Sequence, residues 1–147
     1  MRTAEGTVGR VFVLRLEDGD RIPECIERFA AEKGLLRAFC TLLGGIGEGR
    51  LVVGPEDATG RPVVPMTLGL VGVHEIAAVG TLFPAEDGTA RLHMHGALGR
   101  EDETRTGCVR QGVDVWQVAE AVVVEIVGTN LVRKLDPVLG FQVLSEP

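Results

Sequence analysis

Two histidines and one cysteine are the residues of this sequence whose types and spacing best suit chemistry. His93 and His95 lie two residues apart in the run Arg91–Leu98, and Cys108 follows thirteen residues after His95. On a β-strand, side chains at positions i and i+2 leave the same face, roughly 7 Å apart along the backbone. A chain reversal after this strand would bring Cys108 beside the two rings. Two imidazoles and one thiolate suit zinc in a tetrahedral shell, with the fourth position left for water or a ligand.

The same three residues also have a purely structural interpretation. A His-x-His pair on a strand can form a half-exposed polar face, and a cysteine often acts as a small buried hydrophobe. The sequence lacks the familiar zinc motifs with paired short spacings. The spacing alone therefore leaves both interpretations open.

A helix and several strands must position this segment. β-branched and aliphatic residues predict a first strand over Gly9–Leu16. A helix is expected from about Arg21 to Lys33, with Asp20 as its N-cap and Gly34 at its end. A polar loop is expected over 99–106, between His95 and Cys108, and another loop over 54–65. Further strands are expected at 36–43, at 50–53, in two halves of 68–83, at 113–127, and in a closing hairpin of 131–135 and 141–144.

Three further residues are candidates for a ligand pocket. Gly44 and Gly45 would let the backbone approach a ligand or a neighbouring subunit, or they form a β-bulge. Glu75 lies in apolar company, where a carboxylate needs a partner or a solvent-filled cleft. It is a weak candidate for a general base beside a metal, because backbone donors or a cation across a subunit interface explain it at least as well. His74 is expected at a strand surface, and Trp116 in the core or an interface.

Length and composition predict one domain over residues 1–147, long enough to bury a substantial core. The three cysteines are an odd number with no regular spacing, which does not indicate a disulfide framework and fits a reducing cytoplasm. The sequence has no signal-peptide pattern and no apolar run long enough to cross a bilayer. We therefore expect a cytoplasmic protein with no membrane partner.

The charge balance argues against direct binding to nucleic acid. Fifteen Lys and Arg residues against 21 Asp and Glu residues give a formal net charge of −6, with no basic cluster to neutralise phosphates. The tripeptide Gly60-Arg61-Pro62 is the core of an AT-hook, but its neighbours are Thr59 and Val63 rather than basic residues. This segment is therefore interpreted as a turn.

Four segments together resemble the plants-and-prokaryotes conserved (PPC) domain family, over nearly the whole chain from Val8 to Leu144. They are Val11–Leu16 leading through Gly19-Asp20 to Phe29-Ala30, then Leu43-Gly44, then Gly72–Ile76, and finally Leu92–His95 followed by Gly107–Gly112. The resemblance implies an α+β fold, a mainly antiparallel sheet with flanking helices, and assembly as a homotrimer. It also implies a histidine cluster suited to a metal. Cys108 stands where the family usually has histidine, and a thiolate in that place keeps a zinc ligand.

The resemblance further implies a DNA-associated or regulatory role. Plant relatives couple this domain to separate AT-hooks, while the domain itself mediates assembly and partner contacts. Since this chain is acidic and has no hook, we expect the assembly and partner-binding part of that role, with zinc at His93, His95 and Cys108. The alternative is a metal-dependent small-molecule-binding protein or hydrolase-like enzyme. No nucleophile has an obvious base beside it, which favours a non-catalytic role. A structural trimer with a metal-free polar pocket is the third possibility.

Overall fold

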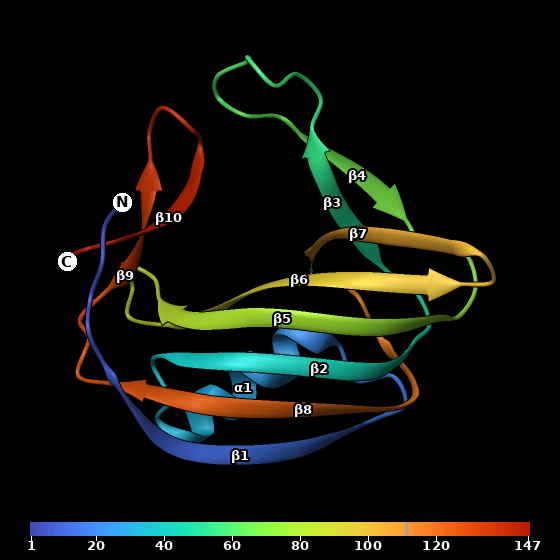
Figure 1. The fold of residues 1–147 in the computed structure, drawn as a ribbon, viewed down its shortest axis with the longest axis horizontal. Helices are drawn as coiled ribbons and strands as arrows, with labels where there is room; N and C mark the ends of the chain where they lie inside the picture. The colour runs from blue at the N-terminus through green and yellow to red at the C-terminus, as the bar shows by residue number, and fades with distance from the viewer. Residues whose placement is uncertain (111) are drawn as a thin grey trace.

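The chain is built mainly from β-strands, as its many β-branched and aliphatic residues predict (Figure 1). The computed structural model describes residues 1–110 and 112–147. The strands are β1 (Thr7–Glu17), β2 (Ala38–Ile46), β3 (Arg50–Pro55), β4 (Pro65–Gly69), β5 (His74–Pro84), β6 (Ala90–Arg100), β7 (Glu103–Val109), β8 (Val115–Val127), β9 (Val132–Asp136) and β10 (Phe141–Ser145). The described residues contain one α-helix, α1 (Ile22–Lys33), where several flanking helices were expected.

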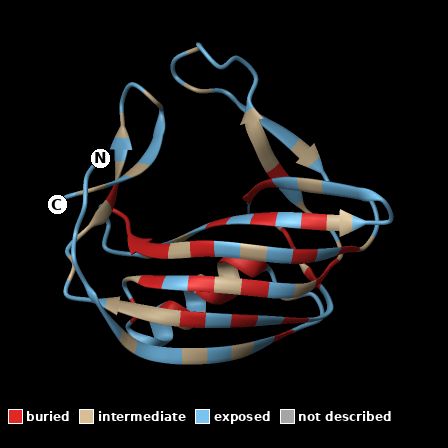
Figure 2. Ribbon diagram, in the orientation of Figure 1, coloured by how far each residue is buried: buried red, intermediate tan, exposed pale blue. Residues whose placement is uncertain are grey.

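Eight of the strands form one antiparallel sheet in the order β1-β8-β2-β5-β6-β7-β3-β4, and β9 and β10 form a separate hairpin. Side chains alternate between the two faces of each strand, so that one face packs against α1 and the other stays exposed (Figure 2). Cys40 and Leu42 of β2 and Met94 of β6 are fully or almost fully buried on the helix side. The mainly antiparallel α+β architecture predicted from the sequence is confirmed.

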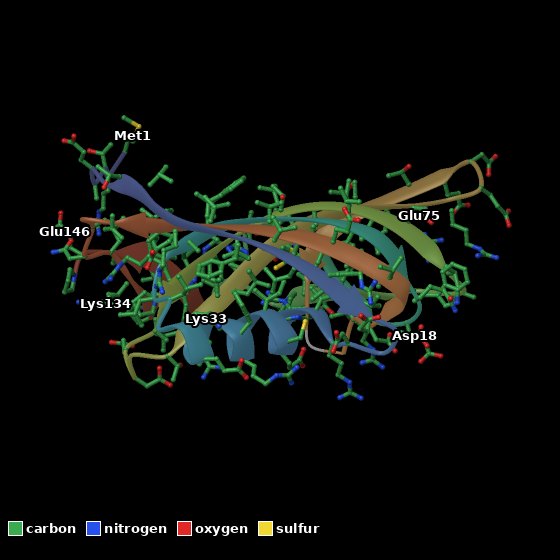
Figure 3. The ribbon with its side chains drawn as sticks, turned by 90° about the horizontal axis from the view of Figure 1, so that it is seen from below. Met1, Asp18, Lys33, Glu75, Lys134 and Glu146 are labelled. Atoms are coloured by element: carbon green, nitrogen blue, oxygen red, sulfur yellow. The ribbon has the colours of Figure 1, made fainter. Side chains whose placement is uncertain are left out.

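Helix α1 lies along one face of the sheet (Figure 3). Ile22, Ile26 and Ala30 are completely buried against the strands. Gly34 ends the helix with φ +64°, the left-handed conformation that glycine adopts without strain. The expected N-cap is wrong by one residue. Arg21 occupies the N-cap position without a side-chain hydrogen bond, and the Asp20 carboxylate instead accepts a hydrogen bond from the Glu17 amide in the preceding turn.

The hairpin between β6 and β7 is tighter than the sequence predicted. Arg100 pairs with Glu103, so only Glu101 and Asp102 form the turn, and Glu101 adopts a positive φ of 55°. The polar loop expected over 99–106 is therefore mostly strand. Polar residues fit a strand here because this end of the hairpin projects into solvent, where no core selects for apolar side chains.

Gly44 and Gly45 form a bulge in β2, which was one of the two interpretations open from the sequence. The register between β2 and β8 shifts between Gly44 and Ile46, and Gly44 has φ +139°. A Cβ atom at Gly44 would lie 2.5 Å from the Ala119 Cα, and one at Gly45 would lie 2.6 Å from the Trp116 carbonyl oxygen. These glycines therefore allow β8 to approach β2 closely within the same chain.

All three cysteines are free, in agreement with the absence of a disulfide framework expected from the sequence, and all three are buried. Among the described residues, no helix is both long enough and apolar enough to span a membrane. Trp116 is 45% exposed rather than buried in the core.

Candidate metal and ligand site

The two histidines of β6 project from the face of the sheet that α1 does not cover. Met94, the residue between them, is buried on the helix side, while His93 and His95 are exposed. Their rings meet edge to face, with centroids 5.0 Å apart and an interplanar angle of 78°. The two Nε2 atoms are 3.2 Å apart. One ring can therefore donate a hydrogen bond to the other when one Nε2 is protonated and the other is not.

Cys108 reaches the histidines because β7 runs antiparallel beside β6. The register places Cys108 opposite His95, and residues directly opposite each other project from the same face. The Cys108 side chain is buried, with a relative exposure of 4%. The candidate ligand atoms of the three residues all lie within 4.8 Å of one another. One tight hairpin therefore gathers both nitrogens and the sulfur.

The donor atoms fit a zinc ion in number and type, and the two nitrogens also fit it in spacing. With Zn–N distances of about 2.0–2.1 Å, two nitrogens of a tetrahedral site lie roughly 3.3 Å apart. The observed Nε2–Nε2 distance of 3.2 Å matches this separation without movement of either ring. Two imidazoles and a thiolate are also the ligand types that favour zinc over hard cations such as Mg²⁺.

The surroundings favour the neutral form of His93, which is the form that ligates a metal. Although the residue is exposed, partial desolvation of the ring lowers the pKa of His93, and the positive charges of Arg133, His95 and Arg110 lower it further. Burial raises the pKa of the Cys108 thiol, while Arg110 and Arg133 oppose that rise. Binding of a metal at Cys108 would therefore release a proton.

The histidines and Cys108 open into a cavity of about 750 Å³. Strand β6 lies between the two arms that rise above it in Figure 1, the β3–β4 side and the β9–β10 hairpin, and residues of both arms line the cavity. The lining is mostly apolar, with four arginines. Its residues are Val52, Gly54, Pro55, Ala58, Arg61, Val63, Pro65, Arg91, Leu92, His93, His95, Cys108, Arg110, Arg133, Leu139, Gly140, Phe141 and Gln142.

Arg133 of β9 is the functional candidate that the sequence interpretation missed. Its relative exposure is 7%, and its Nη2 donates to the Thr81 carbonyl oxygen at 3.2 Å and to the Thr81 hydroxyl at 3.0 Å. Its Nε is buried with no hydrogen-bond partner among the described residues, and burial lowers the pKa of Arg133. No signal in the sequence distinguished Arg133, because Lys134 and Asp136 of the same short strand are charged as well.

Glu75, Gly44 and Gly45 do not line this cavity. Glu75 lies on the face of the sheet away from α1 (Figure 3), but it pairs with Gly99, four residues beyond His95 on β6. That spacing corresponds to roughly 13 Å along a strand. The structure therefore does not bring Glu75 to the three candidate ligands within one protomer.

His74 also lies apart from the cluster. It is buried rather than exposed at a strand surface, with a relative exposure of 5%. Its Nδ1 lies 2.8 Å from the Gly72 carbonyl oxygen, which satisfies the ring locally.

The fold and this cluster define an antiparallel β-sheet domain with two imidazoles and a thiol at the floor of a cavity. The sequence profile of the Plants and Prokaryotes Conserved (PCC) domain matches residues 3–127. The chain belongs to this family, which is the PPC family identified by resemblance above. A search of the curated proteins gives no match to the sequence.

Solved structures share the fold. A metal-containing protein from Archaeoglobus fulgidus is 24% identical, with a TM-score of 0.86 and coverage of 99% of this chain and 100% of its own. A plant- and prokaryote-conserved protein from Pyrococcus horikoshii is 21% identical, with a TM-score of 0.85 and coverage of 100% and 99%. A presumed DNA-binding protein from Ralstonia eutropha is 19% identical, with a TM-score of 0.76 and coverage of 92% and 90%.

Proposed function

We propose that this protein is a self-assembling, zinc-binding PPC-domain module with a regulatory role, and that His93, His95 and Cys108 hold the metal. The observation that carries the proposal is the convergence of two imidazole nitrogens and one sulfur within 4.8 Å at the floor of a cavity. The metal-containing relative from Archaeoglobus fulgidus supports a metal in this fold. Zinc held by three protein ligands would offer one open position, at which it acts as a Lewis acid toward a ligand donor atom.

The exposed face of the sheet supports self-assembly. Eight large apolar side chains on β1, β2, β5 and β8 project from the face away from α1 and are each at least one-third exposed. They are Val11, Val13, Phe39, Leu43, Val79, Trp116, Val118 and Val122. Large exposed apolar patches on soluble proteins mark interaction surfaces. Together with the family resemblance, this patch favours a homotrimer.

The regulatory role is proposed to proceed through assembly and partner binding rather than through direct contact with DNA. Relatives of this fold include a presumed DNA-binding protein, but the formal net charge of this chain is −6. This excess of acidic residues disfavours the attraction to phosphates on which binding to duplex DNA depends. In a gel-shift assay we expect weak or no binding of duplex DNA at physiological salt. Tight, salt-sensitive binding would contradict this part of the proposal.

A metal-dependent small-molecule-binding protein or hydrolase-like enzyme is the second candidate, favoured by the cavity of about 750 Å³ above the three ligands. Small-molecule sites commonly have volumes of about 300–1,000 Å³. Among the described lining residues, none is a carboxylate that could act as a general base. Glu75 also lies elsewhere on the sheet, so the described lining of one protomer offers no carboxylate base, which favours binding over catalysis.

Elemental analysis of protein purified without a histidine tag tests the metal site. We expect about one zinc per chain in the wild type and loss of zinc in His93→Ala and Cys108→Ser, because each variant removes one of three protein ligands. His74→Gln and Cys25→Ala remove a histidine and a cysteine outside the cluster and should keep the metal. Zinc retained at the wild-type level in both cluster variants would refute the assignment.

A further inference from the structure

We propose that the cavity above His93, His95 and Cys108 binds a small organic anion, whose carboxylate or phosphate headgroup is held by Arg133 and Arg110 and whose apolar body contacts the two arms. The inference deepens the proposed function by assigning a ligand class to that site. It rests on the proposed function, because the headgroup is placed next to the proposed metal ligands.

The charge of the cavity is opposite to the charge of the chain. Four arginines line it, at positions 61, 91, 110 and 133, and the described lining residues include no aspartate or glutamate. The whole chain has an excess of six acidic residues over basic ones. Because low-dielectric walls strengthen the field inside a cleft, such a concentration of one sign attracts anions.

The four arginines differ in how far the protein already neutralises them. Arg91 lies 3.6 Å from carboxylate oxygens of both Glu27 and Asp87, so its charge is partly balanced. Arg61 donates to the carbonyl oxygens of Ala58 and Gly60, which carry no net charge. Within the described part of the chain, Arg61, Arg110 and Arg133 have no carboxylate partner within ion-pair distance. Because Arg61 is hydrogen-bonded to its own loop, Arg110 and Arg133 are assigned to the anion.

Arg133 is the strongest indication of a missing partner. A buried guanidinium is costly unless it is paired and hydrogen-bonded. Arg133 has only the Thr81 oxygens and the ring of Phe83, with its Cζ 5.9 Å from the ring centroid, and its buried Nε lacks a hydrogen-bond partner among the described residues. An anion in the cavity would supply the charged partner that Arg133 lacks.

The remaining walls require an apolar body on the ligand. Val52, Val63, Leu139 and Phe141 contribute most of the large apolar side chains from the two arms. Arginine presents planar, paired donors that match carboxylate and phosphate oxygens, and it discriminates against neutral groups. The site therefore favours an amphiphilic anion over inorganic phosphate and over a neutral amide of the same shape.

Isothermal titration calorimetry with hexanoate, hexyl phosphate and hexanamide tests the inference on full-length protein, with and without zinc. We expect hexanoate or hexyl phosphate to bind, and since the three share an alkyl chain, the better of the two anions identifies the headgroup. Hexanamide and inorganic phosphate should bind at least tenfold more weakly. Arg110→Gln and Arg133→Met should each weaken the anion about tenfold or more, because each removes charge-assisted hydrogen bonds. Arg28→Gln, on the exposed side of α1, is the matched control and should bind as the wild type does.

Three outcomes would overturn the inference. They are equal binding of hexanamide, wild-type affinity in both arginine variants, and no binding of either organic anion to the folded protein. If Arg133→Met does not fold, the exposed Arg110→Gln still decides the result. The two proposals can fail separately. A protein that holds no zinc but binds the anion through its arginines would refute the metal site and support the anion site.

Discussion

Cys108 differs in type from the other two candidate ligands, because it offers sulfur where His93 and His95 offer nitrogen. A thiolate brings a negative charge that a neutral imidazole does not, so a bound dication would retain less positive charge. Burial raises the pKa of the thiol, and Arg110 and Arg133 oppose that rise. The two arginines therefore help Cys108 to ionise, in addition to any contact with a ligand.

Cobalt substitution distinguishes Cys108 from a histidine in the same place. Co²⁺ in the wild-type site should show a thiolate-to-metal charge-transfer band in the near ultraviolet. Cys108→His should still bind Co²⁺ but lose this band, because an imidazole replaces the thiolate as the third ligand. Cys40→Ala removes another buried thiol and should leave the band unchanged. A band that persists in Cys108→His would show that the sulfur ligand is a different residue.

Glu125 is the acid whose ionisation is most strongly linked to folding. Arg10 donates to both of its carboxylate oxygens through Nε and Nη2, each at 2.8 Å, and through its backbone amide at 3.0 Å. These hydrogen bonds lower the pKa of Glu125 from 4.5 to about 2. The folded-state pKa is depressed, so the stabilisation is fully present above about pH 4.5 and is lost as the pH falls toward 2.

Glu125→Gln should therefore destabilise the protein at pH 6 and make its stability less dependent on pH between about 5 and 2. Urea denaturation measured across this range checks the expectation, since a neutral amide removes the linked proton uptake. Glu86→Gln removes an exposed carboxylate from the turn before β6 and should keep the wild-type pH dependence. Identical slopes in wild type and Glu125→Gln would contradict the linkage.

At the scale of elements, the periodicity of the sequence predicted the helix and the strands that bury one face against adjacent elements. The apolar stripe of α1, the β-branched runs of β1 and β8, and the closing hairpin all appear within a few residues of the expected positions. Local pattern is sufficient there because each element buries one face. The same reasoning predicted too long a loop between β6 and β7. The strands are exposed to solvent there, so paired strand residues can be polar.

The candidate metal ligands could be predicted because they depend on one hairpin, in which strand alternation alone brings His95 opposite Cys108. The cavity could not be predicted, because its walls come from segments distant in the sequence. Arg133 reaches the cavity because β9 lies beside the end of β5, where Ala85 and Arg133 form a β-bridge. No periodicity within β9 encodes that contact. Glu75 was grouped with the site from its residue type, without knowledge of its position along β5.

Gly107 determines how closely β3 approaches the hairpin that contains the site. A Cβ atom at Gly107 would lie 2.6 Å from the Val52 carbonyl oxygen and 3.0 Å from the Leu51 Cβ. Gly107→Ala should therefore displace β3 and lower the free energy of unfolding by about 1–3 kcal/mol, as overpacking does in a close contact. It should also weaken zinc binding, because Cys108 is the next residue.

Thermal unfolding and zinc titration measure these two effects. Gly69→Ala is the matched strand control, because its added Cβ would meet no atom within 4 Å. The control should unfold and bind zinc like the wild type. A Gly107→Ala protein as stable as the control would show that β3 can shift without cost and does not constrain the site.

At the scale of the whole molecule, two surfaces have opposite chemical character. The cavity between the arms concentrates positive charge, while the sheet face away from α1 presents apolar side chains from four strands. Burial of that face by further copies would remove it from water and leave the acidic remainder of the surface to maintain solubility. In the proposed assembly, the apolar face would join the subunits and the cavity would bind the ligand, both on the same sheet.

Disruption of the apolar face should separate the subunits without unfolding them. Light scattering after size-exclusion chromatography should give the wild type the mass of three 15.7 kDa chains, as the family resemblance implies. Leu43 and Val13 are 58% and 79% exposed on this face, so Leu43→Glu and Val13→Glu should yield folded monomers, because each buries a charge only upon association. Val71→Glu, at an 84% exposed position before β5, should remain a trimer. A monomeric wild type, or a trimer that survives both substitutions, would show that this face does not join the subunits.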